Sequence, residues 1–451
     1  MRYARYAWPP MTTEFSVAFR AALESGRLTD LADAYAPDAA FEGYLPGGLR
    51  EAHGPRAIVA ELERQLGPAP IVRDWTVKTP TWIELEIARR GSRRGKPGST
   101  APAARLRQFH VFAVDHAGLV TRQWAYPMML DTVAGGDSGA RHRRVERPDG
   151  SVVYEKLISP SHDWLMRATR DPGREAILWR DGVINALPGG LVDPILSAEP
   201  EGDGWRLTMP DVSAELHQPD PSTDWWRRVM TSLDALHERY RGRPPRGICR
   251  LEDRHQALAE RTALAEVDGM DRVPKMIQHG WRAAPGLLPD DVRDRLITLA
   301  REPDLLIAAL SDAAPTMLHG DASPGNLGIR GDTVFAIDWA LAASGPPEVE
   351  FAWLFAHSAR LDELLDLTRE ILGRHHHELR LRLALLYNFV WMLPLITWWR
   401  AVCPPDEVAA ADVELAWWLA SAREGLAVLD GRRLTRLAEV TAAAATDSPP
   451  N

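Results

Sequence analysis

Hydrophobic positions in the first third of the chain change from helical spacing to alternation. Between residues 13 and 31, apolar side chains recur every three to four residues, first at Phe15, Phe19 and Leu23, which predicts helices. A further helix is predicted over residues 54–62, with Pro55 near its first turn. Strands are predicted over residues 40–44, 75–88, 104–115 and 119–126. This order indicates an α+β unit in which helices precede a meandering antiparallel sheet.

From residue 128 onwards, a short strand-rich stretch precedes a long helical one. Strands are predicted over residues 130–134, 144–147, 152–158 and 205–209. The remainder has mostly helical periodicity, apart from a hairpin predicted over residues 327–337. A chain of 451 residues exceeds the size of one ordinary core. We therefore predict three units, over residues 1–127, 128–215 and 216–451.

Composition narrows the class of protein. Hydrophobic residues make up 45% of the chain and charged residues 25%, as in soluble globular proteins. The net charge of −9 argues against a nucleic-acid partner. The most apolar segments are interrupted by charges or proline, so we expect no membrane partner and a cytoplasmic location. Two distant cysteines, Cys249 and Cys403, form neither a zinc spacing nor a disulfide framework.

Lysine is rare in this chain. Only four of the 53 basic residues are lysines, and the rest are arginines. Lys156 stands within an apolar predicted strand, where a generic positive charge would not be placed without a reason. It is therefore a candidate functional residue.

The densest cluster of candidate chemistry lies between His319 and Asp338. His319-Gly320-Asp321 is followed by Asn326 and, twelve residues later, by Asp338. Two carboxylates and one carboxamide around a turn and a hairpin are suited to hold magnesium and to orient a hydroxyl group towards a nucleotide phosphate.

Phosphoryl transfer also requires groups that hold the nucleotide. A glycine-rich loop is predicted at residues 135–139. Because glycines lack side chains, such a loop lets backbone N–H groups approach phosphate oxygens. Its candidate residues are Gly135, Gly136, Ser138 and Gly139. Lys156 lies on a strand that follows this loop, at the spacing expected for an ammonium group that reaches nucleotide phosphates. Glu175 lies early in a predicted helix after Pro172-Gly173 and is the candidate partner of Lys156.

These residues resemble the aminoglycoside phosphotransferase and choline kinase-like family over about residues 128–430. The resemblance implies a two-lobed, protein-kinase-like fold, ATP and Mg²⁺ as cofactors, and a hydroxyl of a small molecule as acceptor. It implies that Asp321 orients or deprotonates the acceptor, that Asn326 and Asp338 bind magnesium, and that His319 braces the catalytic loop. Glu350 stands where an aspartate is more usual in the family.

The same resemblance places an interlobe hinge at Met209-Pro210-Asp211, where the backbone of Met209 and Asp211 would meet adenine. Pro210 has no backbone N–H to donate, so it stays an open question which of the usual backbone contacts with adenine form there. Aromatic and acidic residues in the last helices, among them Trp391 and Trp398, suit either a cationic acceptor pocket or plain core packing.

Residues 11–126 resemble the nuclear transport factor 2-like (SnoaL-like) cone fold by their pattern of helices and strands. The resemblance implies a ligand pocket, which we expect to be lined by Tyr44, Trp75, His110 and Trp124. Gly43 occupies the place of the aspartate base of ketosteroid-isomerase-like members, which disfavours isomerase chemistry. Cone domains also form homodimers through their sheets.

The favoured hypothesis is an ATP- and magnesium-dependent O-phosphotransferase of a small molecule such as an aminoglycoside or amino alcohol, with an accessory cone domain. Two alternatives stay open. One is a non-catalytic nucleotide-binding sensor, and the other is a cyclase-type or dehydratase-type enzyme in the cone with an auxiliary kinase domain.

Overall fold

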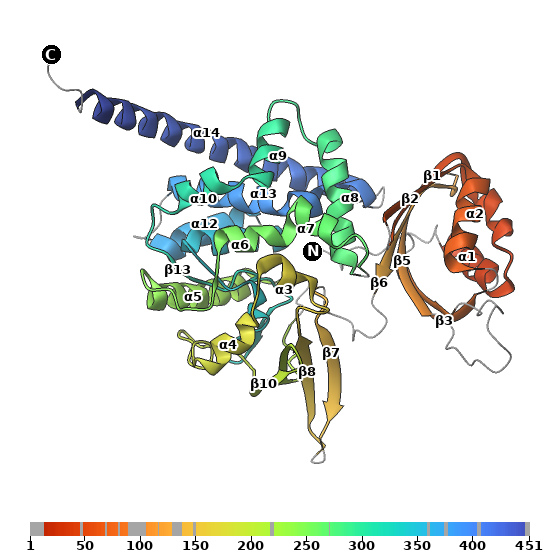
Figure 1. Ribbon diagram of the computed structural model, residues 1–451, viewed down its shortest axis with the longest axis horizontal. Coiled ribbons are helices and arrows are strands. Elements are labelled where there is room, and N and C mark those ends of the chain that lie inside the picture. Colours follow the sequence, from red (N-terminus) through yellow and green to blue (C-terminus); the bar gives the residue numbers. More distant parts are fainter. Residues whose placement is uncertain are drawn as a thin grey trace.

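The protein is a mixed α+β chain, seen in a computed structural model (Figure 1). The structure describes residues 13–45, 48–67, 70–79, 82–88, 105–115, 117–128, 138–147, 150–216, 221–269, 271–358, 361–373, 378–403 and 407–446.

The N-terminal unit is a curved six-stranded sheet with its helices on one side. The helices are α1 (Thr13–Ser25), the 3-10 helix η1 (Leu28–Ala34) and α2 (Pro55–Leu66). The strands are β1 (Tyr35–Leu45), β2 (Gly48–His53), β3 (Ile71–Thr79), β4 (Trp82–Ala88), β5 (Arg105–Val114) and β6 (Val120–Met128), in the order β2-β1-β6-β5-β4-β3. Among the described residues of this sheet, the β1–β6 pair is parallel and the other four pairs are antiparallel. The single strand predicted over residues 75–88 is wrong, because Val77 pairs with Ile83 across an antiparallel ladder.

The two faces of this sheet bury different side chains. Successive strand residues point to opposite faces, so Trp75 and His110 pack with Phe19 on the helix side. Tyr44 and Trp124 point the other way and join the core of the C-terminal part. The pocket predicted from these four residues is therefore wrong, since the sheet itself separates them.

The outer face of the sheet packs against helices α8 (Arg272–Leu287) and α13 (Glu378–Val402) (Figure 1). The Tyr126 hydroxyl on β6 lies 2.8 Å from His279 Nδ1 and accepts a hydrogen bond of 2.8 Å from Trp398 Nε1. Burial lowers the pKa of His279 to about 3, so its ring is neutral. The ring of Tyr44 stacks on His279 at 4.6 Å. We call the contact formed by Tyr44, Tyr126, His279 and Trp398 the seam.

A four-stranded sheet follows in the chain. Its strands are β7 (Arg141–Glu146), β8 (Val152–Ile158), β10 (Ser197–Glu201) and β11 (Gly204–Pro210), in the order β10-β11-β8-β7, accompanied by α3 (Trp164–Thr169) and α4 (Arg174–Arg180). Helix α4 begins where it does because Asp171 Oδ1 accepts the backbone N–H groups of Gly173 and Arg174. The strand predicted over residues 130–134 lies outside the described residues.

The rest of the chain is mainly helical. Its further helices are α5 (Thr223–Tyr240), α6 (Leu251–His255), η2 (Gln256–Leu258), α7 (Glu260–Ala265), α9 (Arg293–Arg301), α10 (Asp304–Leu310), η3 (Trp339–Leu341), α11 (Pro347–Leu354), η4 (Phe355–His357), α12 (Leu361–Leu372) and α14 (Val408–Thr446). Short strands form two small sheets, β12 (Cys249–Arg250), β16 (Ala343–Gly345) and β13 (Thr316–Leu318), and β14 (Leu327–Arg330), β15 (Thr333–Ala336) and β9 (Leu191–Val192). The hairpin predicted over residues 327–337 is confirmed as β14–β15.

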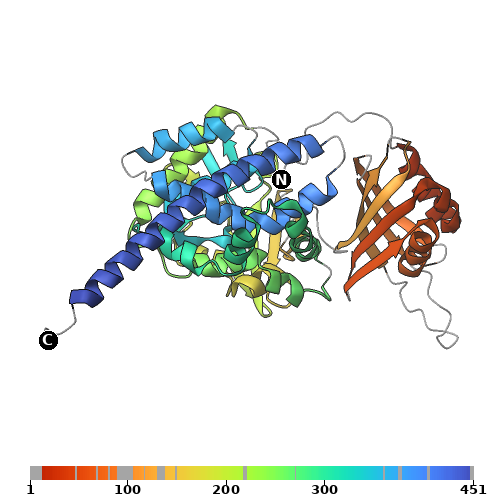
Figure 2. The ribbon, with the colours of Figure 1, turned by 90° about the horizontal axis from the view of Figure 1, so that it is seen from above.

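Helix α13 is the core of this part, and α14 crosses over it and projects beyond the other helices (Figure 2). By length and composition α13 is apolar enough to cross a membrane, but 72% of its most hydrophobic window is buried inside the protein. The expectation that every apolar segment is interrupted before this length therefore fails for α13. The helix meets α8 at Gly280, where an added Cβ would lie 1.6 Å from the carbonyl oxygen of Pro394. Backbone approaches backbone there only because Gly280 has no side chain.

Candidate functional site

Lys156 lies at the centre of the first group of candidate residues. Its Nζ is 2.7 Å from Glu175 Oε2 on α4 and 2.7 Å from Asp338 Oδ1, which follows strand β15. The side chains of Lys156 and Glu175 are 6% and 1% exposed, whereas that of Asp338 is 36% exposed. The predicted Lys156–Glu175 pair therefore exists in the structure, and a second carboxylate joins it.

The pKa values of the two carboxylates shift in opposite directions. Burial alone would lower the pKa of Lys156, but Asp338 and Glu175 outweigh it and raise that pKa above its usual value. Burial likewise opposes ionisation of Asp338, yet the neighbouring ammonium lowers the pKa of Asp338. Burial raises the pKa of Glu175. Asp338 therefore carries the charge that is open to solvent, and Glu175 anchors the lysine from inside.

The loop after β13 carries Asp321 and Asn326. Asn326 Nδ2 donates to the main-chain oxygen of Asp321 at 3.0 Å and to Asp321 Oδ2 at 2.9 Å. Gly320 has a φ of +83° there, and an added Cβ would lie 1.8 Å from the carbonyl oxygen of Leu341. Only glycine fits this turn. Burial raises the pKa of Asp321 to about 7, well above that of an ordinary aspartate.

Ile337 joins this loop to Asp338. Its backbone N–H donates to the carbonyl oxygen of Asn326 at 3.0 Å, and its own carbonyl oxygen accepts from His319 Nε2 at 3.0 Å. His319 Nδ1 accepts the backbone N–H of Asp321 at 3.3 Å. Burial lowers the pKa of His319, so a neutral imidazole holds the loop from both ring nitrogens. This geometry agrees with the bracing role expected of His319.

Two buried charged residues secure the loop from behind. Glu350 on α11 accepts the backbone N–H groups of His319 at 2.6 Å and Gly320 at 2.9 Å. Burial opposes ionisation of Glu350, but these bonds and His237, at 3.4 Å, outweigh it and lower its pKa. Arg254 on α6 donates from Nε to the carbonyl oxygen of Gly320 at 2.9 Å.

The sequence reasoning did not assign Glu350, Arg254 or His237 to the site. A signal existed for Glu350, an acid within the apolar run of α11. Arg254 stands in a charged stretch, Glu252-Asp253-Arg254-His255, and has no distinguishing neighbours in the sequence.

Comparison with known proteins gives a family match that includes part of this site. Residues 191–386 match the model of the phosphotransferase enzyme family (APH). We call this stretch the phosphotransferase region; it contains Asp321, Asn326 and Asp338, whereas Lys156 and Glu175 precede it. The match supports a phosphotransferase and leaves the acceptor open. A search of curated proteins found no match.

Several solved structures are similar to the chain. The choline kinase LicA from Streptococcus pneumoniae is 11% identical, covers 65% of this chain and 94% of its own, and has a TM-score of 0.39. The macrolide 2′-phosphotransferase MphH from Brachybacterium faecium is 14% identical, covers 62% and 88%, and has a TM-score of 0.36. An NTF2-like protein from Mesorhizobium loti is 13% identical, covers 27% and 95%, and has a TM-score of 0.21.

Upstream of the phosphotransferase region, the glycine loop is described only in part. Gly135 and Gly136 lie outside the described residues. The carbonyl oxygen of Ser138 accepts the backbone N–H of Leu165 at 3.4 Å, and Gly139 packs against the carbonyl of His162. This end of the loop therefore rests on the start of α3.

The expected hinge lies at the end of β11. Met209 is buried, and Pro210 pairs with Val153 at the strand end. Asp211 Oδ1 accepts the backbone N–H of Ser213 at 3.1 Å, and the Asp211 carboxylate lies 3.6 Å from Arg144. The side chain of Asp211 therefore shapes the turn, and only its backbone is left for the expected adenine contact.

Asn326 and Asp338 fit a magnesium ion by the chemistry of their donors. Both hydrogens of Asn326 Nδ2 are directed to Asp321, so the amide presents its carbonyl oxygen elsewhere. Asp338 supplies a partly exposed carboxylate. Magnesium prefers oxygen ligands and takes one or two from the protein, with waters and substrate phosphates completing the shell. In the part of the chain that the structure describes, no cluster of three or more His, Cys, Asp or Glu residues forms a closed metal cage.

Proposed function

We propose that the protein is an ATP- and magnesium-dependent O-phosphotransferase that phosphorylates a hydroxyl group of a small molecule. The observation that carries the proposal is the direct contact of Lys156 with both Glu175 and Asp338, joined through Ile337 to the Asp321–Asn326 loop. Residues from β8, α4 and two loops lie far apart in the sequence and meet at one place. Their order along the chain is the order expected for a kinase.

In this proposal Lys156 holds the nucleotide phosphates and is itself held by Glu175. Asn326 and Asp338 hold magnesium, which when bound offsets negative charge on the phosphates. Met209 and Asp211 meet adenine with their backbone. The hinge and the glycine loop belong to a small lobe over residues 128–215, and the catalytic loop belongs to a large lobe over residues 216–451.

Asp321 would act on the acceptor. Its carboxylate accepts the proton of the acceptor hydroxyl as the hydroxyl oxygen forms a bond to the γ-phosphorus. The bond from that phosphorus to the β,γ-bridging oxygen breaks, and ADP leaves with the bonding electron pair. Asp321 then releases the proton to solvent. A pKa near 7 suits a group that accepts and releases a proton at neutral pH.

We propose that the N-terminal unit is an accessory cone domain of the nuclear transport factor 2-like type. Its interior contains the aromatic rings of Phe15, Phe19 and Phe112, of which the first two stack and the third meets both edge to face, and polar side chains that bond one another. This filling favours a structural over a catalytic role. The outer sheet face, through which cone domains dimerise, packs against α8 and α13 of the same chain.

The test uses the full-length protein. Titration with ATP by calorimetry, with and without Mg²⁺, should show magnesium-dependent binding in the wild type. Asp338→Ala should weaken that binding by about 100-fold or more, because a metal ligand is worth several kcal/mol. Asp332→Ala is the matched control, since Asp332 is fully exposed at the tip of the same hairpin. Equal magnesium-dependent binding in wild type and Asp338→Ala contradicts the proposed site.

A further inference from the structure

One face of the four-stranded sheet carries Lys156 together with the residues directly opposite it on the two neighbouring strands. In the antiparallel ladder His142 on β7 pairs with Lys156 on β8, and Lys156 pairs in turn with Leu207 on β11. Residues directly opposite one another point to the same face, with Cβ atoms roughly 4.5–5.5 Å apart. His142 therefore lies beside the Lys156 side chain, on the side of the sheet where that lysine meets Asp338.

A second row of residues on the same face lies nearer the expected hinge. Two residues along from the first row, Arg144, Tyr154 and Met209 stand opposite one another. Because a strand rises about 3.3 Å per residue, the two rows are roughly 7 Å apart. The proposed function places adenine at Met209 and the phosphates at Lys156. His142 therefore lies at the phosphate end of the face, shortly after the glycine loop in the chain.

The ring of His142 is half-buried and neutral. Burial lowers the pKa of His142 to about 4; the Lys156 ammonium adds to this shift, and the Asp338 carboxylate opposes it. A neutral imidazole has one N–H donor and one nitrogen that accepts. Within the described ranges of the chain, no group forms a hydrogen bond with either ring nitrogen of His142. Its N–H is therefore free to bond a ligand.

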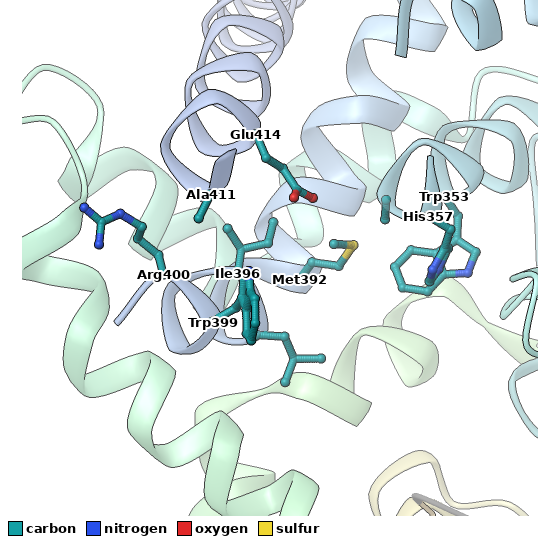
Figure 3. A pocket seen from close by; sticks show the side chains of 10 residues that line it. Trp353, His357, Met392, Ile396, Trp399, Arg400, Ala411 and Glu414 are labelled. Carbon is teal, nitrogen blue, oxygen red and sulfur yellow. The ribbon is translucent and has the colours of Figure 1, made fainter. Parts of the chain in front are cut away.

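Two other ring nitrogens show by contrast what is particular to His142. In the part of the chain that the structure describes, Trp353 Nε1 and His357 Nε2 also have no hydrogen-bond partner. They belong to the lining of a small pocket between the α11–η4 segment, α13 and α14, with a cavity of about 70 Å³ (Figure 3). Both nitrogens are closed off from solvent, so no ligand reaches them there. The His142 ring instead keeps a partly exposed surface beside Lys156.

We propose that His142 binds the nucleotide by donating its ring N–H to a phosphate oxygen beside the oxygen that Lys156 holds. This inference rests on the proposed function, and it adds a residue of β7 to a site otherwise formed by β8, α4 and two loops. A hydrogen bond to a charged phosphate oxygen is stronger than one between neutral groups. A neutral donor also suits this position because a second permanent cation would repel the Lys156 ammonium.

The test separates the hydrogen bond from the shape of the ring. His142→Phe keeps a flat ring without a donor, and His142→Gln keeps an N–H donor. The full-length proteins are titrated by calorimetry with ATP in the presence of Mg²⁺ and with adenosine, at about pH 8, well above the pKa of His142. His142→Phe should bind ATP about tenfold more weakly than the wild type and His142→Gln within about threefold of it, while adenosine binds all three equally. His53→Phe, at an exposed position on β2, is the matched control and should bind both ligands as the wild type does.

The outcomes separate the inference from the proposed function. Magnesium-dependent ATP binding that is equal in the wild type and His142→Phe overturns the inference and leaves the phosphotransferase intact. Equal losses for ATP and adenosine also overturn it, because they report a distortion of the lobe, and so does tighter adenosine binding by His142→Phe, which would place the ring on the base. Urea denaturation checks that each variant folds, and His142→Leu, with a smaller side chain, replaces His142→Phe if that variant does not. Absence of magnesium-dependent ATP binding by the wild type removes the proposed function itself.

Discussion

Two groups of buried polar residues, one in each half of the molecule, differ in charge and in exposure to solvent. The catalytic cluster consists of Lys156, Glu175 and Asp338, all of them ionisable and one of them partly exposed. The cone cluster consists of Tyr35, Gln123, His110 and Gln108. Its members are buried, and they bond in a chain from the Tyr35 hydroxyl to Gln123, from Gln123 Nε2 to His110 Nδ1 at 2.8 Å, and from His110 Nε2 to Gln108 at 3.2 Å.

The difference lies in what each cluster leaves for a ligand. Burial lowers the pKa of His110 to about 3, so the cone cluster is neutral and its side chains satisfy one another. The catalytic cluster instead brings one ammonium between two carboxylates, beside a second aspartate whose pKa is near 7. Burial alone therefore does not mark a catalytic site; a charged group open to one side does.

The largest expected effect is on turnover in Asp321→Asn. The amide preserves the shape of the loop but accepts no proton, so ADP release with an acceptor should fall by about 10²–10⁴-fold while ATP affinity persists. In the wild type the active form is the carboxylate, so kcat/KM should rise as pH increases through about 7. That rise should vanish in the variant. An unchanged pH profile in Asp321→Asn contradicts the role given to Asp321.

Lys156→Met tests whether the catalytic cluster depends on its central charge. Removing the ammonium leaves the buried Glu175 beside Asp338 without a positive partner, which should lower the free energy of unfolding by about 3–5 kcal/mol. ATP binding should be lost as well. Urea denaturation followed by tryptophan fluorescence measures the first effect. A loss below about 1 kcal/mol would contradict the dependence of this cluster on its central charge.

His110→Ala tests the cone cluster in the same way. The unpaired Gln123 and Gln108 amides should cost about 1–3 kcal/mol of stability, and turnover per folded molecule should stay unchanged. His53→Ala, at an exposed position on β2, is the matched control. A fall in turnover without a loss of stability would instead place chemistry in the cone and favour the cone-enzyme alternative.

Tyr126→Phe has the smallest expected effect and tests how the two halves are joined. The variant removes the hydroxyl that bonds His279 and Trp398 and keeps the ring, so a loss of about 1 kcal/mol is expected. Limited proteolysis should then cut between the halves faster than in the wild type. Tyr240→Phe, which removes one longer hydrogen bond, of 3.4 Å, to the carbonyl oxygen of Val183 and lies outside the seam, measures the general cost of the change.

The site residues that could be predicted from the sequence lie close to one another along the chain or in a recognisable order. Asp321 and Asn326 are five residues apart in one loop, and the β14–β15 hairpin brings Asp338 back to them, so their proximity follows from the chain itself. The Lys156–Glu175 pair was predicted because lysine is rare in this chain and because Glu175 lies early in a helix after the Lys156 strand, in the chain order expected of a kinase-type site. The mixed α+β class of the chain could likewise be predicted from alternating and helical periods.

Long-range packing accounts for what was missed. Glu350 and Arg254 reach Gly320 from 30 and 66 residues away, and no local pattern records such contacts. The predicted cone pocket failed for a related reason. The four side chains were predicted to line one pocket, but alternation along the strands sends Trp75 and His110 to one face of the sheet and Tyr44 and Trp124 to the other.

The seam has a practical consequence for handling this protein. Cutting the chain near residue 127 would expose the rings of Tyr44, Phe109, Trp124 and Tyr126 on one fragment and those of His279 and Trp398 on the other. Each large aromatic ring brings roughly 150–250 Å² of surface, so both fragments would carry patches large enough to cause aggregation. Insolubility of either fragment would therefore report on the cut surface, and the activity of each half is best assigned by point variants in the intact chain.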